Sequence, residues 1–482
     1  MSNSEGTKVE QVISAVKQQI QRRGLVPGAM LPSVRKMAGT TAFSKSTIVE
    51  AYERLAAEGV VRSRPGAGFY VAAPLAPLSI AEIEPRLDPV IDPLWMLRQS
   101  LYLQPDALKP GCGWLPDSWM DDELVRRGLR ALARGETSRL VGYDSPMGSE
   151  SLRVVIARRL GDQSIDAAPD QVLLTDSGTH AIDLVCRFLI ETGDTVLVDD
   201  PCYFNFHSIL RAHRAKVVAV PYTPNGPDVV AFAQILAEHR PRLYITNSAV
   251  HNPTGATLAA STAHRVLKLA EAHDLIIVED DIFADFEVTP TPTLAAYDGL
   301  DRVIRVGSFS KSLSSAVRCG HIAARRDWIG ALTDLRIATG LSGSALSAEL
   351  LRSVLTDGTY RRHMEKLRRR LAEARSEALR RLGEIGITPW IRPEAGLFLW
   401  CRLPNDVNGA EVARRALAEQ VVLAPGNVFS VARSAASFLR FNVAMMNNEK
   451  IYRTLKRLCA EVGKSPARSA APDPSLSKQR PA

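Results

Sequence analysis

The hydrophobic positions near the start of the chain repeat at a helical spacing. Apolar residues recur every three or four positions before Gly24, which predicts an amphipathic helix. They are Val9, Val12, Ile13, Val16 and Ile20. A turn at Pro27-Gly28 follows, and Ser33 is positioned to cap a second, short helix.

A third helix and a pair of strands follow within the next 30 residues. Residues 42–61 carry a helical apolar stripe, formed by Ile48, Tyr52 and Leu55, and Gly59 marks the end of that helix. The sequence VVRSRPGAGFYVA at 60–72 predicts two short strands around a Pro-Gly-Ala-Gly turn. Three helices followed by a basic hairpin predict a winged helix-turn-helix.

The net charge of this N-terminal region indicates which kind of partner the predicted winged helix-turn-helix binds. The first 72 residues hold ten Lys or Arg and five Glu, a net charge of +5 out of +8 for the whole chain. This excess is typical of a surface that binds double-stranded DNA, although a helical protein-interaction module with a solvated basic face would look the same. The residues predicted to contact DNA lie on the two later helices and the hairpin: Arg35, Ser44, Lys45, Ser46, Thr47, Arg62, Arg64 and Gly66.

Beyond the winged helix-turn-helix (1–72), the pattern predicts three further segments. Residues 73–95 hold five prolines without periodicity, which indicates a linker. From 96 to 462, short apolar runs alternate with helical patterns, which predicts an α/β domain with a mainly parallel sheet and a smaller second lobe. The Pro- and Ser-rich residues 463–482 are predicted to be a disordered tail.

Composition narrows the compartment and the class of site. The six cysteines are scattered without a CxxC pair, which argues against a zinc site or a disulfide framework and favours a reducing cytoplasm. No apolar run is long enough to cross a bilayer, and the N-terminus lacks the pattern of a secretory signal. We therefore expect a cytoplasmic protein without a metal site.

The segment 303–322, VIRVGSFSKSLSSAVRCGHI, carries the first candidate chemistry. Ser308, Ser310, Lys311 and Arg318 follow an apolar strand within eleven residues. Hydroxyls and a guanidinium bind phosphate, and a lysine amine forms a Schiff base with carbonyl cofactors, pyridoxal phosphate in particular. A polar loop with a surface lysine is the alternative interpretation.

Four other strand ends carry residues that complete such a site. Asp280 closes an apolar strand and can pair with a pyridine nitrogen, and Asn252 in HNPTG can donate to a phenolate oxygen. Tyr203 can stack on a planar ring, and the backbone of Gly178 and Thr179 begins a helix where phosphate binds. Each piece alone has an ordinary structural explanation, but five in this order predict one cofactor site.

These motifs resemble two known families. SFSK with its downstream arginine, together with NPTG, resembles the class I/II aminotransferases of the aspartate aminotransferase fold, fold type I of pyridoxal-phosphate proteins. PGAMLPSVRKMA, SKSTIVEAYERLAAEGVV and RPGAGFYV resemble the winged helix-turn-helix of GntR-type repressors. Their fusion resembles the MocR subfamily of bacterial transcriptional regulators.

The resemblance implies a role for each matching residue. Lys311 would form the Schiff base, Asp280 would pair with the pyridine nitrogen, and Asn252 would donate to the cofactor's O3′. Tyr203 would stack on the ring. The phosphate would be held by Gly178, Thr179, Ser308, Ser310 and Arg318, together with Tyr143 of the neighbouring subunit. Arg440 would bind the α-carboxylate of an amino acid.

Two positions depart from the family pattern. Phe283 stands where many relatives carry a tyrosine that donates to O3′, which weakens the expectation of efficient transamination. Thr179 and His180 stand where relatives often have glutamines, so the phosphate contacts there are less well matched.

Three functions are compatible with the sequence. The first is a homodimeric DNA-binding regulator that senses pyridoxal phosphate, or an amino acid or amine, and binds an operator with two half-sites. The second is a working aminotransferase that uses an amino acid and a keto acid acceptor. The third is a constitutive DNA-binding protein with a structural cofactor, which would leave Arg440 unexplained.

Overall fold

The computed structural model describes residues 7–21, 28–58, 60–64, 68–71, 98, 101, 106–134 and 141–464. The chain divides into two compact units, Met1–Ser79 and Ile80–Ala482, and each is described by itself. The predicted linker (73–95), Gly66 and residues 465–482 of the predicted tail lie outside the described residues. The last helix, α17 (Glu449–Lys464), includes the first two positions assigned to that tail.

The first unit contains the predicted helices and hairpin. Its elements are α1 (Lys8–Gln21), α2 (Val34–Thr41), α3 (Lys45–Ala57), β1 (Val61–Arg64) and β2 (Gly68–Val71). The hydroxyl of Ser33 accepts a hydrogen bond from the backbone N–H of Lys36 at 3.3 Å, so this residue caps α2 as expected. The predicted apolar stripes of α1 and α3 are buried together with β1 and β2 in one core.

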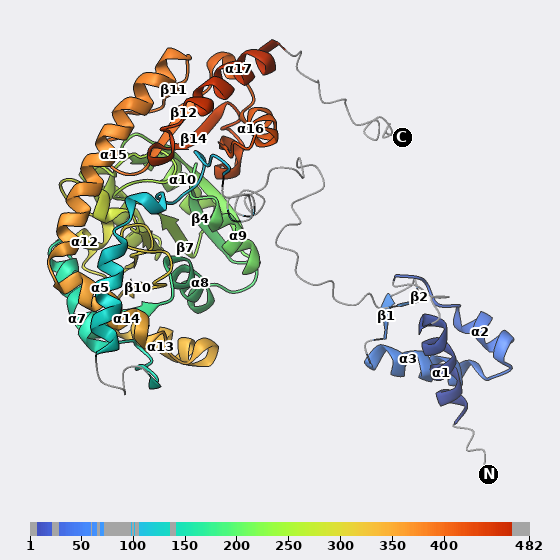
Figure 1. The fold of residues 1–482 in the computed structure, drawn as a ribbon. Helices are drawn as coiled ribbons and strands as arrows, with labels where there is room; N and C mark the ends of the chain where they lie inside the picture. The colour runs from blue at the N-terminus through green and yellow to red at the C-terminus, as the bar shows by residue number, and fades with distance from the viewer. Residues whose placement is uncertain are drawn as a thin grey trace. The chain divides into compact units, whose positions relative to one another are not determined.

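The second unit is built on an eight-stranded sheet with the order β3-β10-β9-β8-β7-β4-β5-β6 (Figure 1). The strands are β3 (Val172–Thr175), β4 (Thr195–Asp200), β5 (Lys216–Thr223), β6 (Gly226–Pro227), β7 (Leu243–Thr246), β8 (Ile276–Asp280), β9 (Val303–Ser308) and β10 (Gly320–Ala323). β4, β5, β7, β8 and β9 pair in parallel, as predicted. β10 was not predicted; it runs antiparallel between β9 and β3.

Helices cover both faces of this sheet. Val196 and Val198 join one apolar cluster with α8 (Gly178–Leu189), α9 (Asn205–Ala212) and α13 (Arg326–Gly340). Leu197 joins the opposite cluster, which also contains residues of α7 (Glu150–Gly161), α10 (Val229–His239), α11 (Ala260–Ala272) and α12 (Leu294–Asp298). Because successive strand residues point to opposite faces, the near-continuous apolar runs of these strands follow from burial on both sides.

The smaller lobe follows a long helix along the outside of the second unit, α15 (Thr359–Glu384), drawn in orange (Figure 1). Its antiparallel sheet has the order β11 (Thr388–Pro389), β12 (Phe398–Arg402), β14 (Phe438–Asn442) and β13 (Ala424–Pro425). The remaining helices with bounds in the described residues are α5 (Asp122–Ala133), α14 (Ala345–Thr356), α16 (Gly409–Ala418) and α17. Short 3₁₀ helices lie at 117–119, 169–171, 284–286, 404–406, 426–429 and 443–445.

Candidate functional site

The predicted site residues follow the carboxyl ends of neighbouring strands. Gly178 follows β3, Tyr203 follows β4, Asn252 follows β7, and Lys311 follows β9, while Asp280 is the last residue of β8. β3 and β9 both run opposite to β10, so these five strands end at the same edge of the sheet. Open α/β sheets bind ligands at this edge.

Four of the predicted residues line one cavity of about 70 Å³: Tyr203, Asn252, Lys311 and Arg440. The loop Gly111–Trp114 and the side chains of Phe204, Ile282 and Phe283 complete its wall. Lys311 and Trp114 also line a second, larger hollow of about 690 Å³. Lys311 therefore lines both the smaller cavity and the larger hollow.

Lys311 and Asp280 are electrostatically linked. Burial, and then the positive charge of Arg440, lowers the pKa of Lys311 to about 8, although the carboxylate of Asp280 opposes this shift. Burial, and then the neighbouring Asp281, raises the pKa of Asp280 to about 7. Asp280 is 2% exposed, and its Oδ1 has no hydrogen-bond partner among the described residues. A donor such as a protonated ring nitrogen would satisfy that oxygen.

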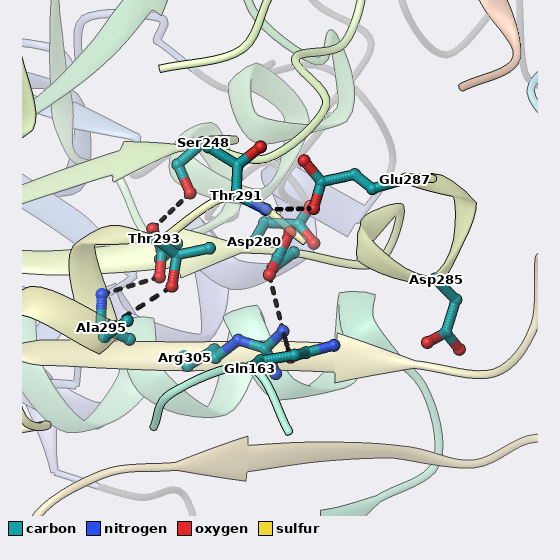
Figure 2. A network of polar contacts seen from close by, with 12 residues as sticks. Gln163, Ser248, Asp280, Asp285, Glu287, Thr291, Thr293, Ala295 and Arg305 are labelled. Carbon is teal, nitrogen blue, oxygen red and sulfur yellow. Dashed lines mark hydrogen bonds and ion pairs between the residues drawn. The ribbon is translucent and has the colours of Figure 1, made fainter. Parts of the chain in front are cut away.

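A polar network holds Glu279 and Asp281, the neighbours of Asp280 in the sequence, and the sequence analysis missed it. Figure 2 shows Arg305 and Gln163 in contact beside Asp280. Arg305 donates to Asp281 at 2.6 Å and to Gln163 at 2.5 Å. Glu279 accepts from the backbone N–H groups of Leu294 and Ala295 at 2.7 and 3.0 Å. The run of three acidic residues that ends β8 was the available signal, because buried carboxylates require such partners.

Arg440 is held beside Asn252, although 188 positions separate them. Its Nη1 donates to Asn252 Oδ1 at 2.9 Å, and its Nη2 donates to the carbonyl oxygen of Gly111 at 2.8 Å. The guanidinium lies 4.2 Å from the ring centre of Phe398, and the residue is 1% exposed. Its Nε has no partner among the described residues. A buried cation with a free donor can bind the carboxylate of a ligand.

The predicted phosphate residues are only partly brought together. The hydroxyls of Ser308 and Ser310 lie 3.1 Å apart, and a Cβ built on Gly178 would lie 3.5 Å from Ser308 Cβ. Gly320 lies against this turn, since a Cβ there would lie 2.6 Å from the backbone of Ser177. A larger residue at this glycine would therefore displace the start of α8, a constraint that the sequence analysis missed.

The other predicted phosphate residues lie on the outside of this unit. Thr179 and Arg318 are exposed, and Arg318 lines a different cavity together with Asp176 and Arg336. Tyr143 is 88% exposed. These positions match the family pattern, but within one chain they do not line the cavity that holds Lys311.

Tyr203 and Phe283, two aromatic residues that line the pocket, pack against different neighbouring rings. Tyr203 lies 5.1 Å from Phe204 and 5.4 Å from Phe206 between ring centres, and burial raises the pKa of its hydroxyl to about 12. Phe283 packs edge-on against Phe398 at 5.4 Å. No hydroxyl is therefore present at the position where relatives often carry a tyrosine.

Helix α15 holds the residue that follows Lys311. The hydroxyl oxygen of Tyr360 lies 2.7 Å from Ser312 Oγ, and the Nε2 of His363 lies 3.0 Å from the carbonyl oxygen of Ser312. The same tyrosine donates to Asp285 at 2.5 Å. The segment that carries the lysine is thus fixed from outside the pocket, which sequence spacing alone did not indicate.

In the first unit, the predicted DNA-contacting residues gather at the start of α3 and on β1. Ser44 accepts from the backbone N–H of Thr47 at 3.2 Å, and its hydroxyl lies 2.7 Å from that of Thr47 and 2.9 Å from that of Ser46. Lys45 is exposed, as are Arg35 on α2 and Arg62 on β1. Arg64 lies on β1, and Gly66 is outside the described residues. The start of α3 thus presents hydroxyls and a cation, as a phosphate-facing recognition helix does.

Two kinds of site are absent from the described part of the chain. None of its helices combines the length and the apolar composition that a bilayer span requires. Within the same residues, no three or more His, Cys, Asp or Glu side chains are grouped as metal ligands.

Comparison with known families and structures agrees with the fold. Residues 115–458 match the family described as aminotransferase class I and II, and residues 8–71 match the bacterial regulatory proteins of the gntR family. LysN from Thermus thermophilus, an alpha-aminoadipate aminotransferase complexed with N-(5'-phosphopyridoxyl)-L-leucine, aligns with a TM-score of 0.70 and 25% identity. That alignment covers 76% of this chain and 95% of the LysN chain.

Relatives also extend over both units. YdcR, an uncharacterized HTH-type transcriptional regulator of Escherichia coli strain K12, is 29% identical over 465 residues, which are 94% of this chain and 98% of YdcR. NorG, an HTH-type transcriptional regulator of Staphylococcus aureus strain USA300, is 26% identical over 90% of this chain and 99% of its own length. The chain therefore belongs to the aminotransferase class I and II family, as a MocR-type HTH transcriptional regulator in which a GntR domain precedes the aminotransferase domain.

Proposed function

We propose that this regulator binds pyridoxal phosphate through Lys311 and uses it to sense an amino acid or amine. The observation that carries the proposal is the shared cavity of Lys311, Asn252 and Arg440, which brings a nucleophilic amine and a carboxylate-binding guanidinium together. The phosphopyridoxyl-leucine adduct with which LysN is complexed supports the same ligand class.

The residues at the strand ends fit the cofactor. When bound, pyridoxal phosphate supplies an aldehyde that captures primary amines reversibly and a ring that withdraws electrons. Asp280 offers a buried, unpartnered oxygen to the ring nitrogen. The hydroxyls of Ser308 and Ser310 and the backbone of Gly178 at the start of α8 offer donors to the phosphate.

The chain's own groups would then select the effector. Arg440 would bind a carboxylate through its Nε, which has no partner among the described residues, and this favours an amino acid over a simple amine as the effector. The pKa of about 8 leaves an appreciable fraction of Lys311 neutral near pH 7, and only the neutral amine attacks a carbonyl. Phe283 adds no hydroxyl to assist proton transfer, which favours binding over turnover.

The regulator would act as a cytoplasmic homodimer on an operator with two half-sites. Tyr143 is 88% exposed within one chain, which suits a residue that reaches the phosphate of a second subunit. None of the six cysteines, all of which lie in the described part of the chain, forms a disulfide, which suits a reducing compartment. Sedimentation of the purified chain tests the dimer directly.

A second candidate is a working aminotransferase, because Lys311, Asp280 and Arg440 are the groups that such an enzyme needs. The test is a spectral titration of the cofactor-loaded protein with a panel of amino acids and amines, followed by a keto acid. A spectral change that forms and persists supports the sensor, and the compound that causes it is the effector. Conversion of the cofactor to its aminated form, reversed by the keto acid over many cycles, would replace the sensor with the enzyme.

A further inference from the structure

A short segment of α15 concentrates positive charge far from the winged helix-turn-helix in sequence. Residues 359–370 contain six Lys or Arg and one Glu, a net charge of +5. The first 72 residues also carry +5, so the other 398 residues together carry −2. Residues 359–370 are therefore among the most basic segments outside the known DNA-binding domain.

The six cations of this segment divide into two groups. Arg368 and Arg370 turn toward the protein, since Arg368 donates to the carbonyl oxygen of Asp285 at 3.0 Å and Arg370 lies 4.1 Å from the ring centre of Trp119. Arg361 lies 3.8 Å from Glu365 in an exposed ion pair. These three cations therefore have partners within the protein.

Arg362, Lys366 and Arg369 form the second group, which we call the α15 stripe. All three are exposed, and none has an ion pair within the described part of the chain. Their spacing of four and then three residues puts them on one helical face, and at 1.5 Å per residue the stripe is about 10 Å long. Three neighbouring cations without ion-pair partners repel one another, which destabilises the protein alone. Binding of a polyanion would remove this repulsion.

We propose that the α15 stripe binds the phosphate backbone of DNA beside the operator, as a second contact surface of this regulator. The inference rests on the proposed regulatory function, because the partner is the duplex that the GntR domain binds. DNA carries one charge per 1.7 Å of its axis, so about 10 Å of duplex offers roughly six phosphates to three side chains. Such contacts position the duplex without reading its sequence.

The buried face of the same helix gives this contact a connection to the cofactor pocket. Tyr360 and His363 hold Ser312, the residue after Lys311, and they lie on the same two turns of α15 as the stripe. A duplex on the stripe would therefore press on the helix that fixes the lysine segment.

The test compares two triple variants of the full-length chain. Arg362→Ala, Lys366→Ala and Arg369→Ala together remove the stripe. Lys450→Ala, Arg453→Ala and Lys456→Ala together are the control, because they remove three exposed, unpaired cations from one face of α17 within the described residues. Both sets are exposed helix positions where alanine is well tolerated, and circular dichroism checks the fold.

Binding is measured by fluorescence anisotropy at 50–300 mM KCl, with an operator selected from random duplexes by the wild-type chain. It is presented once as the operator alone and once with about 20 base pairs added on each side. Each phosphate contact contributes about 0.9 to the slope of log K against log salt. We expect the stripe variant to lose roughly two to three from that slope on the long duplex and nothing on the short one, while the control variant keeps the wild-type slope on both.

Three results would overturn the inference. An equal loss in the control variant would mean a general effect of net charge. A wild-type slope for the stripe variant on the long duplex would mean that DNA does not touch the stripe; if this variant then failed to regulate transcription with purified RNA polymerase, the partner would be a protein. A wild-type chain that selects no operator from the random duplexes would refute the proposed function itself, and this inference with it.

Discussion

The cofactor pocket and the winged helix-turn-helix hold their cations in opposite surroundings. In the pocket, Arg440 is buried and Lys311 is partly buried, and burial lowers the pKa of both, to about 8 for Lys311 and about 10 for Arg440. On the winged helix-turn-helix, Lys45 and Arg62 are exposed to solvent.

The difference decides how each region can recognise a ligand. A buried cation has fixed neighbours and strong, unscreened interactions, so a single residue determines whether a ligand binds. Exposed cations act through a field that salt weakens, so they contribute in small, similar increments. We therefore expect large, salt-insensitive effects of substitutions in the pocket and small, salt-dependent effects on the DNA-binding surface.

The largest expected effect follows from Lys311→Ala. Removal of the amine abolishes covalent attachment of pyridoxal phosphate, because no other lysine lines the cavity among the described residues. The absorption band of the attached cofactor should disappear completely, while the thermal unfolding midpoint stays near that of wild type. Lys366→Ala on α15 is the matched control and should keep the full band. A band that survives in Lys311→Ala would mean that another residue binds the cofactor.

Arg440→Leu should weaken amino-acid binding about 100-fold. Truncation of one partner of a buried charged contact costs about 2–5 kcal/mol, and 2.7 kcal/mol corresponds to two decades in Kd. The measurement is a spectral titration of the cofactor-loaded variant with an amino acid and with the amine that lacks only its carboxylate. Affinity for the amine should change much less than affinity for the amino acid. Equal losses for the two compounds would show that Arg440 supports the pocket instead of binding a carboxylate.

The pocket also shows where sequence reasoning succeeds and where it stops. The position of Lys311, Asp280 and Asn252 at one edge of the sheet was predictable, because each lies at or after the end of an apolar run and parallel strands end at the same edge. Arg305 and Gln163 lie 142 positions apart in the sequence, so the spacing of nearby residues could not predict their contact. The same is true of Gly320, because its constraint comes from an antiparallel strand that the pattern did not reveal.

The fold was more predictable than the site. Strand and helix periods, caps such as Ser33, and the GntR and aminotransferase motifs together specify the architecture, which the family comparisons confirm. The roles of Arg318 and Tyr143 stay predictions, since both are exposed within one chain and neither lines the cavity of Lys311, and Tyr143 is expected to act on a neighbouring subunit. The sequence of one chain does not show which part of its surface would contact a second subunit.

Lys45→Ala combined with Arg62→Ala should weaken DNA binding roughly tenfold, at about 0.7 kcal/mol for each exposed contact. The slope of log K against log salt should fall by about two, because each lost phosphate contact removes about 0.9. Anisotropy titrations of the operator between 50 and 300 mM KCl measure both quantities. Lys450→Ala with Lys456→Ala on α17 removes the same charge and should leave both unchanged. A tenfold loss without a change of slope would indicate a defect in folding rather than lost phosphate contacts.

The smallest expected effect is the pH dependence of cofactor attachment. Only the neutral amine of Lys311 attacks an aldehyde, and its pKa of about 8 lies below the ordinary 10.5 because of burial and the charge of Arg440. The neutral fraction is roughly 9% at pH 7 and half at pH 8, so the attachment rate should rise about fivefold between them and level off above pH 9. Stopped-flow mixing of cofactor-free protein with pyridoxal phosphate measures this profile. In Arg440→Leu, the midpoint should move to higher pH, because loss of the neighbouring positive charge makes the protonated lysine more stable. A rate that keeps rising beyond pH 10 in the wild-type chain would mean that Lys311 titrates like an exposed lysine. The difference between the pocket and the winged helix-turn-helix would then not extend to the reactivity of their cations.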